Sequence, residues 1–131
     1  MSVTLIEANR IIEGSIAAAA QLNERVSVVV CDPEGRLIAL NRMDGAAVTA
    51  NRGAIGKAVA AAAHGKPSGA ITQYCDHLRD ATVIGEGTPL RFERGALPII
   101  RDYQIQGACG VDGASSRERD ETCARAGIAR L

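Results

Sequence analysis

Aromatic side chains are scarce in this chain, which has one Phe, two Tyr and no Trp among its 131 residues. So few rings leave little to stack on nucleobases, and 15 basic residues balance 15 acidic ones without a basic stretch. Both features argue against nucleic-acid binding. The apolar residues are largely alanines, and because alanine side chains are small, a core built from them must bring backbones close together. We therefore expect tightly packed helices and further burial of surface in a homo-oligomer.

Long apolar runs and paired cysteine motifs are also missing. No run approaches the ~20 apolar residues of a membrane-spanning helix, and no basic segment typical of a signal peptide opens the chain. The cysteines are far apart and form no C-x-x-C motif. We interpret them as reduced thiols in a cytoplasmic protein without membrane contact, with a disulfide pair as the alternative. They are Cys31, Cys75, Cys109 and Cys123.

The first half of the chain predicts a helix followed by a β-hairpin. Thr4 and Glu7 have the spacing of a capping box, and apolar residues recur at helical spacing from 5 to 22. Residues 26–31 and 37–40 are rich in β-branched and aliphatic residues. The Asp-Pro-Glu-Gly sequence between them is typical of a tight turn.

Two helices are predicted next. Thr49 can cap a helix that runs to about His64, where Gly65 suits the left-handed C-cap position. Ser68 can cap a third helix that ends near Arg79.

The last third predicts a loop, a second hairpin and a final helix. Residues 80–93 contain two glycines and a proline and are interpreted as a long loop. Residues 97–100 and 104–111 have strand character, and Ser115 with Glu118 forms a capping box for the last helix. The order α-β-β-α-α-β-β-α predicts a single α+β domain over residues 1–131, with an antiparallel sheet flanked by helices.

Arg42 and Asp44 are the first candidate site residues. They stand two positions apart at a strand end and can face the same side, where an Arg fork holds a carboxylate or phosphate. The alternative is an ordinary corner in which the two side chains stabilise the turn.

Lys57 and His64 are candidates on the following helix. They are seven residues apart and project from the same face, among small residues that leave room for a cavity. The alternative is a solvated face along which Lys57 extends to water. The other histidine is His77, and either imidazole can ligate haem iron. No other metal site is expected.

Several motifs together resemble the GlcG/HbpS family of haem-binding or haem-degrading proteins, which includes the C-terminal domain of PduO-type proteins. They occur in the family's order and cover nearly the whole chain. They are Leu5-x-x-Ala8, 29–37 (VVCDPEGRL), 42–46 (RMDGA), 56–58 (GKA), 95–99 (GALPI), 107–111 (GACGV) and 120–127 (DETCARAG).

The resemblance implies an antiparallel sheet flanked by helices, an oligomer, and haem or tetrapyrrole binding in some members. At two places the chain departs from the family pattern. Asp112 stands where Ser is usual, and the segment from 74 to 94 carries Glu86, Arg91 and Glu93. Both departures bring charge toward the expected pocket and favour a polar small molecule.

Three functional hypotheses follow. The first is a small-molecule-binding protein that takes haem or a related tetrapyrrole, with His64 or His77 as axial ligand. The second is a cofactor-independent catabolic isomerase, tautomerase, hydratase or lyase acting on a polar carboxylated metabolite. In it Arg42 holds the carboxylate, Asp44 or Glu86 is the acid or base, and Lys57 stabilises an enolate. The third is a noncatalytic oligomeric accessory protein.

Overall fold

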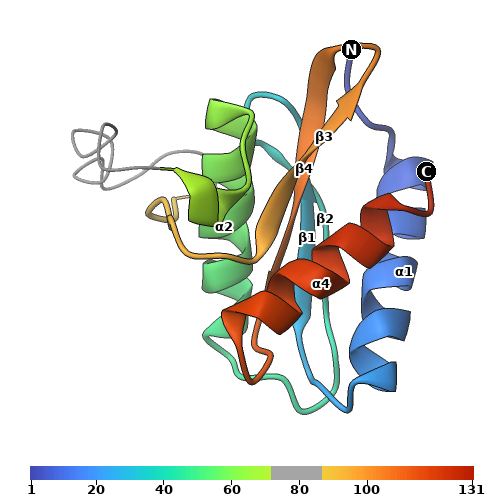
Figure 1. Cartoon of the computed structure of the whole chain (residues 1–131), viewed down its shortest axis with the longest axis vertical. Coiled ribbons are helices and arrows are strands. Elements are labelled where there is room, and N and C mark those ends of the chain that lie inside the picture. Colours follow the sequence, from blue (N-terminus) through green and yellow to red (C-terminus); the bar gives the residue numbers. More distant parts are fainter. Residues whose placement is uncertain (72–86) are drawn as a thin grey trace.

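The computed structural model describes residues 1–71 and 87–131. One antiparallel sheet lies between two layers of helix (Figure 1), and its strand order is β2-β1-β4-β3. α2 covers one face, and α1 and α4 cover the other. In chain order the elements are α1 (Leu5–Gln21), β1 (Ser27–Cys31), β2 (Leu37–Arg42), α2 (Ala50–His64), η1 (Ser68–Ala70), β3 (Ala96–Arg101), β4 (Gln104–Asp112) and α4 (Arg117–Ile128).

The α+β fold class is confirmed, and so are both hairpins. β1 pairs with β2 and β3 pairs with β4, each antiparallel, while β1 and β4 join the two hairpins at the centre of the sheet. The predicted capping box at Thr4 and Glu7 opens α1. Gly65 ends α2 in the left-handed conformation, as predicted.

Two local predictions differ from the structure. In place of the start of the helix predicted from Ser68, the structure has the single 3-10 turn η1, which ends before the extended Ile71, and residues 72–79 lie outside the described residues. Ser116 rather than Ser115 caps α4, because the Ser116 hydroxyl accepts the amide of Arg119. Ser115 is used elsewhere: its amide and hydroxyl both donate to the Glu24 carboxylate.

The buried residues of the sheet alternate between two apolar clusters, as the pleat requires. Val28 and Val30 face α1 and α4, whereas Val29 and Cys31 face the alanines of α2. α2 lies so close to the sheet that a Cβ on Gly110 would meet the backbone of α2. The expectation of tightly packed, alanine-rich helices is thus confirmed for α2.

The described cysteines are buried free thiols, in agreement with the sequence interpretation. Burial raises the pKa of Cys31 and of Cys109 to about 12 and that of Cys123 to about 11. Cys75 lies outside the described residues. In the part of the chain that the structure describes, no helix is long and apolar enough to cross a bilayer.

Candidate ligand-binding sites

Lys57 is fully buried in the middle of α2. Its ammonium donates to an Asp112 oxygen at 2.8 Å, to an Asp120 oxygen at 3.1 Å and to the Val111 carbonyl at 3.2 Å. Asp112 ends β4, and Asp120 stands in the first turn of α4. The side chain therefore passes the end of the sheet and joins the two helical layers.

Two glycines make room for this arrangement. A Cβ on Gly95, just before β3, would lie 2.6 Å from the Lys57 ammonium and 2.8 Å from its Cδ. A Cβ on Gly53 would occupy the position of the Asp112 carboxylate. Gly95 also has a φ of +141°, a conformation that side-chain-bearing residues rarely adopt. Small residues at these positions are thus required for the buried lysine and its partner.

Asp120 is a buried carboxylate with an unusual pKa. One oxygen accepts a hydrogen bond from the Lys57 ammonium, and the other accepts one from the Ala114 amide at 2.9 Å. Burial raises the pKa of Asp120 to about 6, since desolvation outweighs the attraction of Lys57, and the nearby Asp112 carboxylate adds to the increase. This side chain can therefore change its charge close to neutral pH.

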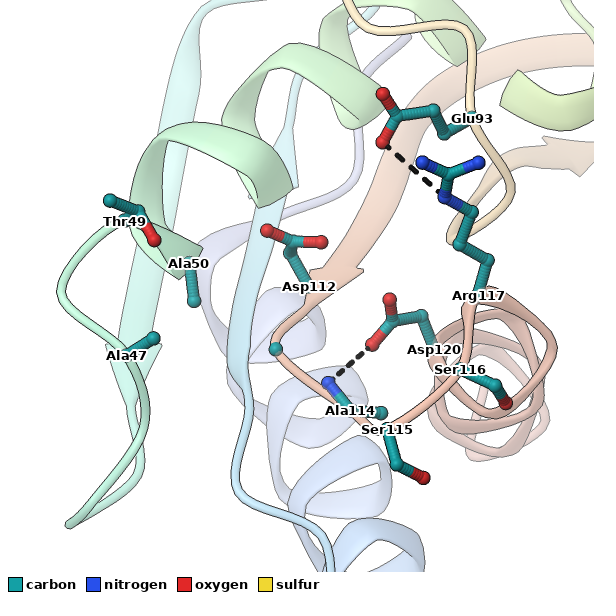
Figure 2. Close-up of a pocket in the computed structure, with 11 residues that line it drawn as sticks. Ala47, Thr49, Ala50, Glu93, Asp112, Ala114, Ser115, Ser116, Arg117 and Asp120 are labelled. Carbon is teal, nitrogen blue, oxygen red and sulfur yellow. Dashed lines mark hydrogen bonds and ion pairs between the residues drawn. The ribbon is translucent and has the colours of Figure 1, made fainter.

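A polar cavity of about 310 Å³ opens beside these carboxylates, between the start of α2 and the start of α4 (Figure 2). At its mouth Arg117 and Glu93 form an ion pair at 3.7 Å. The carboxylates of Asp112 and Asp120 lie on the inner wall. The lining residues are Ala47, Thr49, Ala50, Glu93, Asp112, Gly113, Ala114, Ser115, Ser116, Arg117 and Asp120.

Arg42 and Asp44 lie near this region but have other contacts. Arg42 and Asp112 are both in register with Ser27 of β1, so they stand at the same end of the sheet, roughly 10 Å apart across two strand spacings. The Arg42 guanidinium donates to the Ala46 carbonyl at 3.1 Å. Asp44 is exposed, and its carbonyl accepts from Arg25. The structure thus groups Lys57 with Asp112 and Asp120.

A second cavity, of about 510 Å³, lies along residues 89–93, which pass α2 at Gly56, and Glu93 lines both cavities. Another residue that lines the second cavity, Phe92, makes an edge-on ring contact with His64, at 6.2 Å between centroids. Val59, Ala60, Ile71 and Leu90 form an apolar cluster with Phe92 packed against it.

The predicted site residues Glu86 and His77 lie outside the described residues. Among residues 1–71 and 87–131, no group of three or more His, Cys, Asp or Glu side chains could hold a metal ion.

The residues around the second cavity fit a haem group. His64 offers an imidazole, the ligand type that haem iron takes from globins and peroxidases. Leu90 and the Phe92 ring, which line the cavity, suit a porphyrin face, and Arg91, exposed on the same wall, suits an acidic substituent. The carboxylate-lined polar cavity does not fit, because haem propionates would meet the negative charges of Asp112 and Asp120.

The acidic wall was missed in the functional prediction from sequence. Asp112 departs from the family pattern, and Glu93 belongs to the charged segment 74–94. Both line the polar cavity, whereas Glu86 lies outside the described residues. Asp120 was noted only as part of a family motif. Its place in the first turn after a serine cap is the one sequence signal that could have pointed to it.

The fold and the sequence together define a member of the HbpS-like family. The family model described as "Haem degrading protein HbpS-like" matches residues 3–129, so the chain belongs to this family. This confirms the resemblance found in the sequence. No curated protein matches the chain.

Solved structures agree with this assignment. A double mutant of Streptomyces reticuli HbpS superposes with a TM-score of 0.87 at 30% identity, over 100% of this chain and 88% of that one. Klebsiella pneumoniae protein ORFY superposes with a TM-score of 0.84 at 24% identity, covering 98% and 89%. A complex of PduOC with haem shares the fold, with a TM-score of 0.81 at 20% identity, covering 100% and 96%.

Proposed function

We propose that this protein binds haem or a related tetrapyrrole at the C-terminal end of α2. The observation that carries the proposal is the ring contact between His64 and Phe92 beside the 510 Å³ cavity. The size falls within the range of small-molecule sites. The family description and the haem complex of PduOC support the same ligand class.

Three side chains have distinct roles in this proposal. His64 would hold the iron, Phe92 would pack against the porphyrin, and Arg91 would pair with a propionate. The backbone of Arg91 is fixed to α2, because its amide donates to the Gly56 carbonyl at 3.1 Å. Bound haem would supply redox chemistry at iron. The chain itself would supply the ligand, the apolar wall and the counter-charge.

A haemin titration followed by absorbance tests the proposal. We expect saturable binding of one haem per chain with a sharp Soret band, and loss of the band's shape and about tenfold weaker binding in His64→Ala. Tyr103→Ala is the control, since Tyr103 is a fully exposed ring at the turn between β3 and β4 that lines neither cavity, so its Soret band should stay near that of the unchanged protein. Diffuse absorption without saturation, or a titration unaffected by His64→Ala, would contradict the proposal.

A second candidate function is proton transfer on a small polar molecule in the 310 Å³ cavity. One observation favours it: Asp120, with a pKa raised to about 6, lies on the cavity wall. A group that titrates near neutrality is suited to general acid–base chemistry. Asp120 takes the acid–base role that the sequence hypothesis gave to Asp44 or Glu86. Lys57 holds the Asp120 carboxylate in position through their ion pair. Arg117 lines the same cavity and is the cation nearest its mouth.

Turnover by an Asp120→Asn variant tests this candidate, once a substrate is found by screening small carbonyl compounds. We expect a loss of about a hundredfold or more in kcat. An unchanged kcat in a folded variant would remove Asp120 from the chemistry.

Self-association is proposed as well, on the basis of an apolar surface where β3 meets the end of α4. A shallow cavity of about 430 Å³ lies there, lined largely by Leu97, Pro98, Ile100 and Ile128. Ile100 is 52% exposed, and β3 is an edge strand of the sheet. An exposed edge and an apolar patch are features of protein–protein interfaces.

A further inference from the structure

The inner wall of the polar cavity between α2 and α4 has an excess of negative charge. Lys57 supplies one positive charge, while Asp112 and Asp120 supply two negative charges. At the mouth, Glu93 and Arg117 contribute one charge of each sign and leave the balance unchanged. With both inner carboxylates ionised, this wall is one positive charge short of neutrality.

The missing positive charge affects the carboxyl group of Asp120. Its side chain is 3% exposed and pairs with Lys57, yet its pKa is raised to about 6 by burial and by the Asp112 carboxylate. Buried charges are costly unless they are fully compensated. A second positive charge in the cavity, in addition to Lys57, would neutralise the two carboxylates.

Asp112 is the group that can meet such a charge. Its side chain is 27% exposed and lines the cavity, whereas Lys57 lies behind it at 1% exposure. One Asp112 oxygen accepts from Lys57, and the other lies over Gly53 at the start of α2. Asp112 is thus held from one side and open to the cavity on another.

We propose that this cavity is a second ligand site, which binds a small organic ammonium compound through Asp112. Lys57 acts behind Asp112 as a positioning residue, and Asp120, on the same wall, shares the Lys57 ammonium with Asp112. With the ligand bound, two positive charges, from Lys57 and the ligand, balance the two carboxylates. The volume of about 310 Å³ is at the lower end for ligand sites, so the ligand is a small amine or amino alcohol.

The same charge balance argues against the carboxylated ligand expected from the sequence. A carboxylate or phosphate on this wall would add a further negative charge beside Asp112 and Asp120. Arg117 is the one cation that lines the cavity among the described residues, and it is already paired with Glu93. Anionic ligands should therefore bind much more weakly than ammonium compounds of the same size.

Two probes of equal length and opposite charge test the proposal: 3-aminopropan-1-ol and 3-hydroxypropanoate. Binding is followed by backbone NMR shifts in the full chain at residues 112–114 and 120. We expect saturable shifts with the amine, at least about tenfold weaker binding of the carboxylate, and a similar loss for the amine in Asp112→Asn. Glu118→Gln is the control, since Glu118 is an exposed acidic residue of α4 that does not line the cavity.

The pH dependence gives a second readout. Lys57 faces the wall from α2, Asp112 from β4, Arg117 and Asp120 from α4, and Glu93 from the segment before β3. Because Asp120 loses its proton as pH rises through about 6, amine affinity should rise between pH 5 and pH 7. Asp120→Asn should remove that rise.

Three results would overturn the proposal: equal binding of the two probes, amine binding that Asp112→Asn leaves unchanged, or amine shifts located away from residues 112–114 and 120. If Asp112→Asn does not fold, Asp112→Ser makes the same test. None of these measurements involves His64, so this site and the haem site are tested independently.

Discussion

The Lys57 ammonium and the Asp120 carboxylate are 3.1 Å apart, and both side chains are almost fully buried. The pair joins α2 on one face of the sheet to α4 on the other. Replacing such a pair by apolar side chains often stabilises a fold, so burial alone does not account for it. The pair borders a cavity, and we interpret it as a functional feature that the fold supports.

Removing the lysine should be strongly destabilising. Lys57→Met leaves the buried Asp120 and the partly exposed Asp112 without their counter-charge, and we expect a loss of about 3–5 kcal/mol in the free energy of unfolding. Urea denaturation measures it, with Lys66→Met, at an exposed lysine, as control. The double variant Lys57→Met/Asp120→Asn should lose less than the sum of its single changes. Strict additivity would show that the two side chains do not interact.

Asp120 should make stability depend on pH in a defined window. Its pKa is raised from 3.8 to about 6 in the folded state, so its contribution is fully present below pH 3.8 and is lost as pH rises through about 6. The difference in unfolding free energy between the unchanged protein and Asp120→Asn should thus change between pH 4 and 6.5 and level off above. Glu118→Gln should show no change in that window. A pH-independent difference for Asp120→Asn would contradict the assignment.

Gly95→Ala tests the close approach of Lys57 to the segment before β3. The new Cβ would lie 2.6 Å from the Lys57 ammonium, at a φ of +141°. We expect a loss of roughly 2–4 kcal/mol, from backbone strain and from displacement of the lysine. Gly87→Ala is the matched control, because that glycine also has positive φ but its Cβ would meet nothing within 4 Å. Equal losses would show that backbone strain alone is responsible.

The buried thiols should be inert in the folded protein. Raised pKa values keep Cys31, Cys109 and Cys123 protonated at neutral pH, and the thiolate is the reactive form. Mass spectrometry after iodoacetamide treatment should find these positions unmodified in native protein and alkylated after unfolding. The experiment uses a Cys75→Ala variant, so that only the three buried cysteines can be alkylated. Rapid native alkylation of any of the three would contradict the burial.

The apolar surface at β3 gives a test of self-association. Ile100→Asp places a charge on that surface, and we expect it to lower the molar mass measured by light scattering behind size-exclusion chromatography. Tyr103→Asp changes a more exposed residue at the turn of the same hairpin and should leave the mass unchanged. A monomeric unchanged protein would exclude the proposed assembly.

The fold was predictable because its signals are local. Capping residues, turn sequences and strand-forming runs act over a few positions, so the Thr4 capping box, the turn at residues 32–35 and the Gly65 helix end could be recognised in sequence. The error at α4 was of the same kind. Ser115 and Ser116 are adjacent and both suited to capping, and only the tertiary contact of Ser115 with Glu24 decides between them.

The site was predictable only in part, because its contacts are distant in sequence. Lys57 was identified as a candidate, but its partners are 55 and 63 residues away. Proximity in sequence suggested Arg42 and Asp44 instead. The path of Lys57 past Gly95 depends on how β3 begins beside β4, and no local pattern indicates it. The useful sequence signal was a single lysine in the middle of an alanine-rich helix. Only the packing of that helix shows that Lys57 pairs with Asp112 and Asp120.

The location of bound porphyrin tests the account most directly. Diamagnetic gallium protoporphyrin can be added to isotopically labelled protein and the backbone NMR shifts mapped. We predict saturable shifts centred on His64, Arg91 and Phe92, with residues 112–114 and 120 left unperturbed. Shifts centred on Asp112 and Asp120, or no saturable shift anywhere, would contradict this prediction.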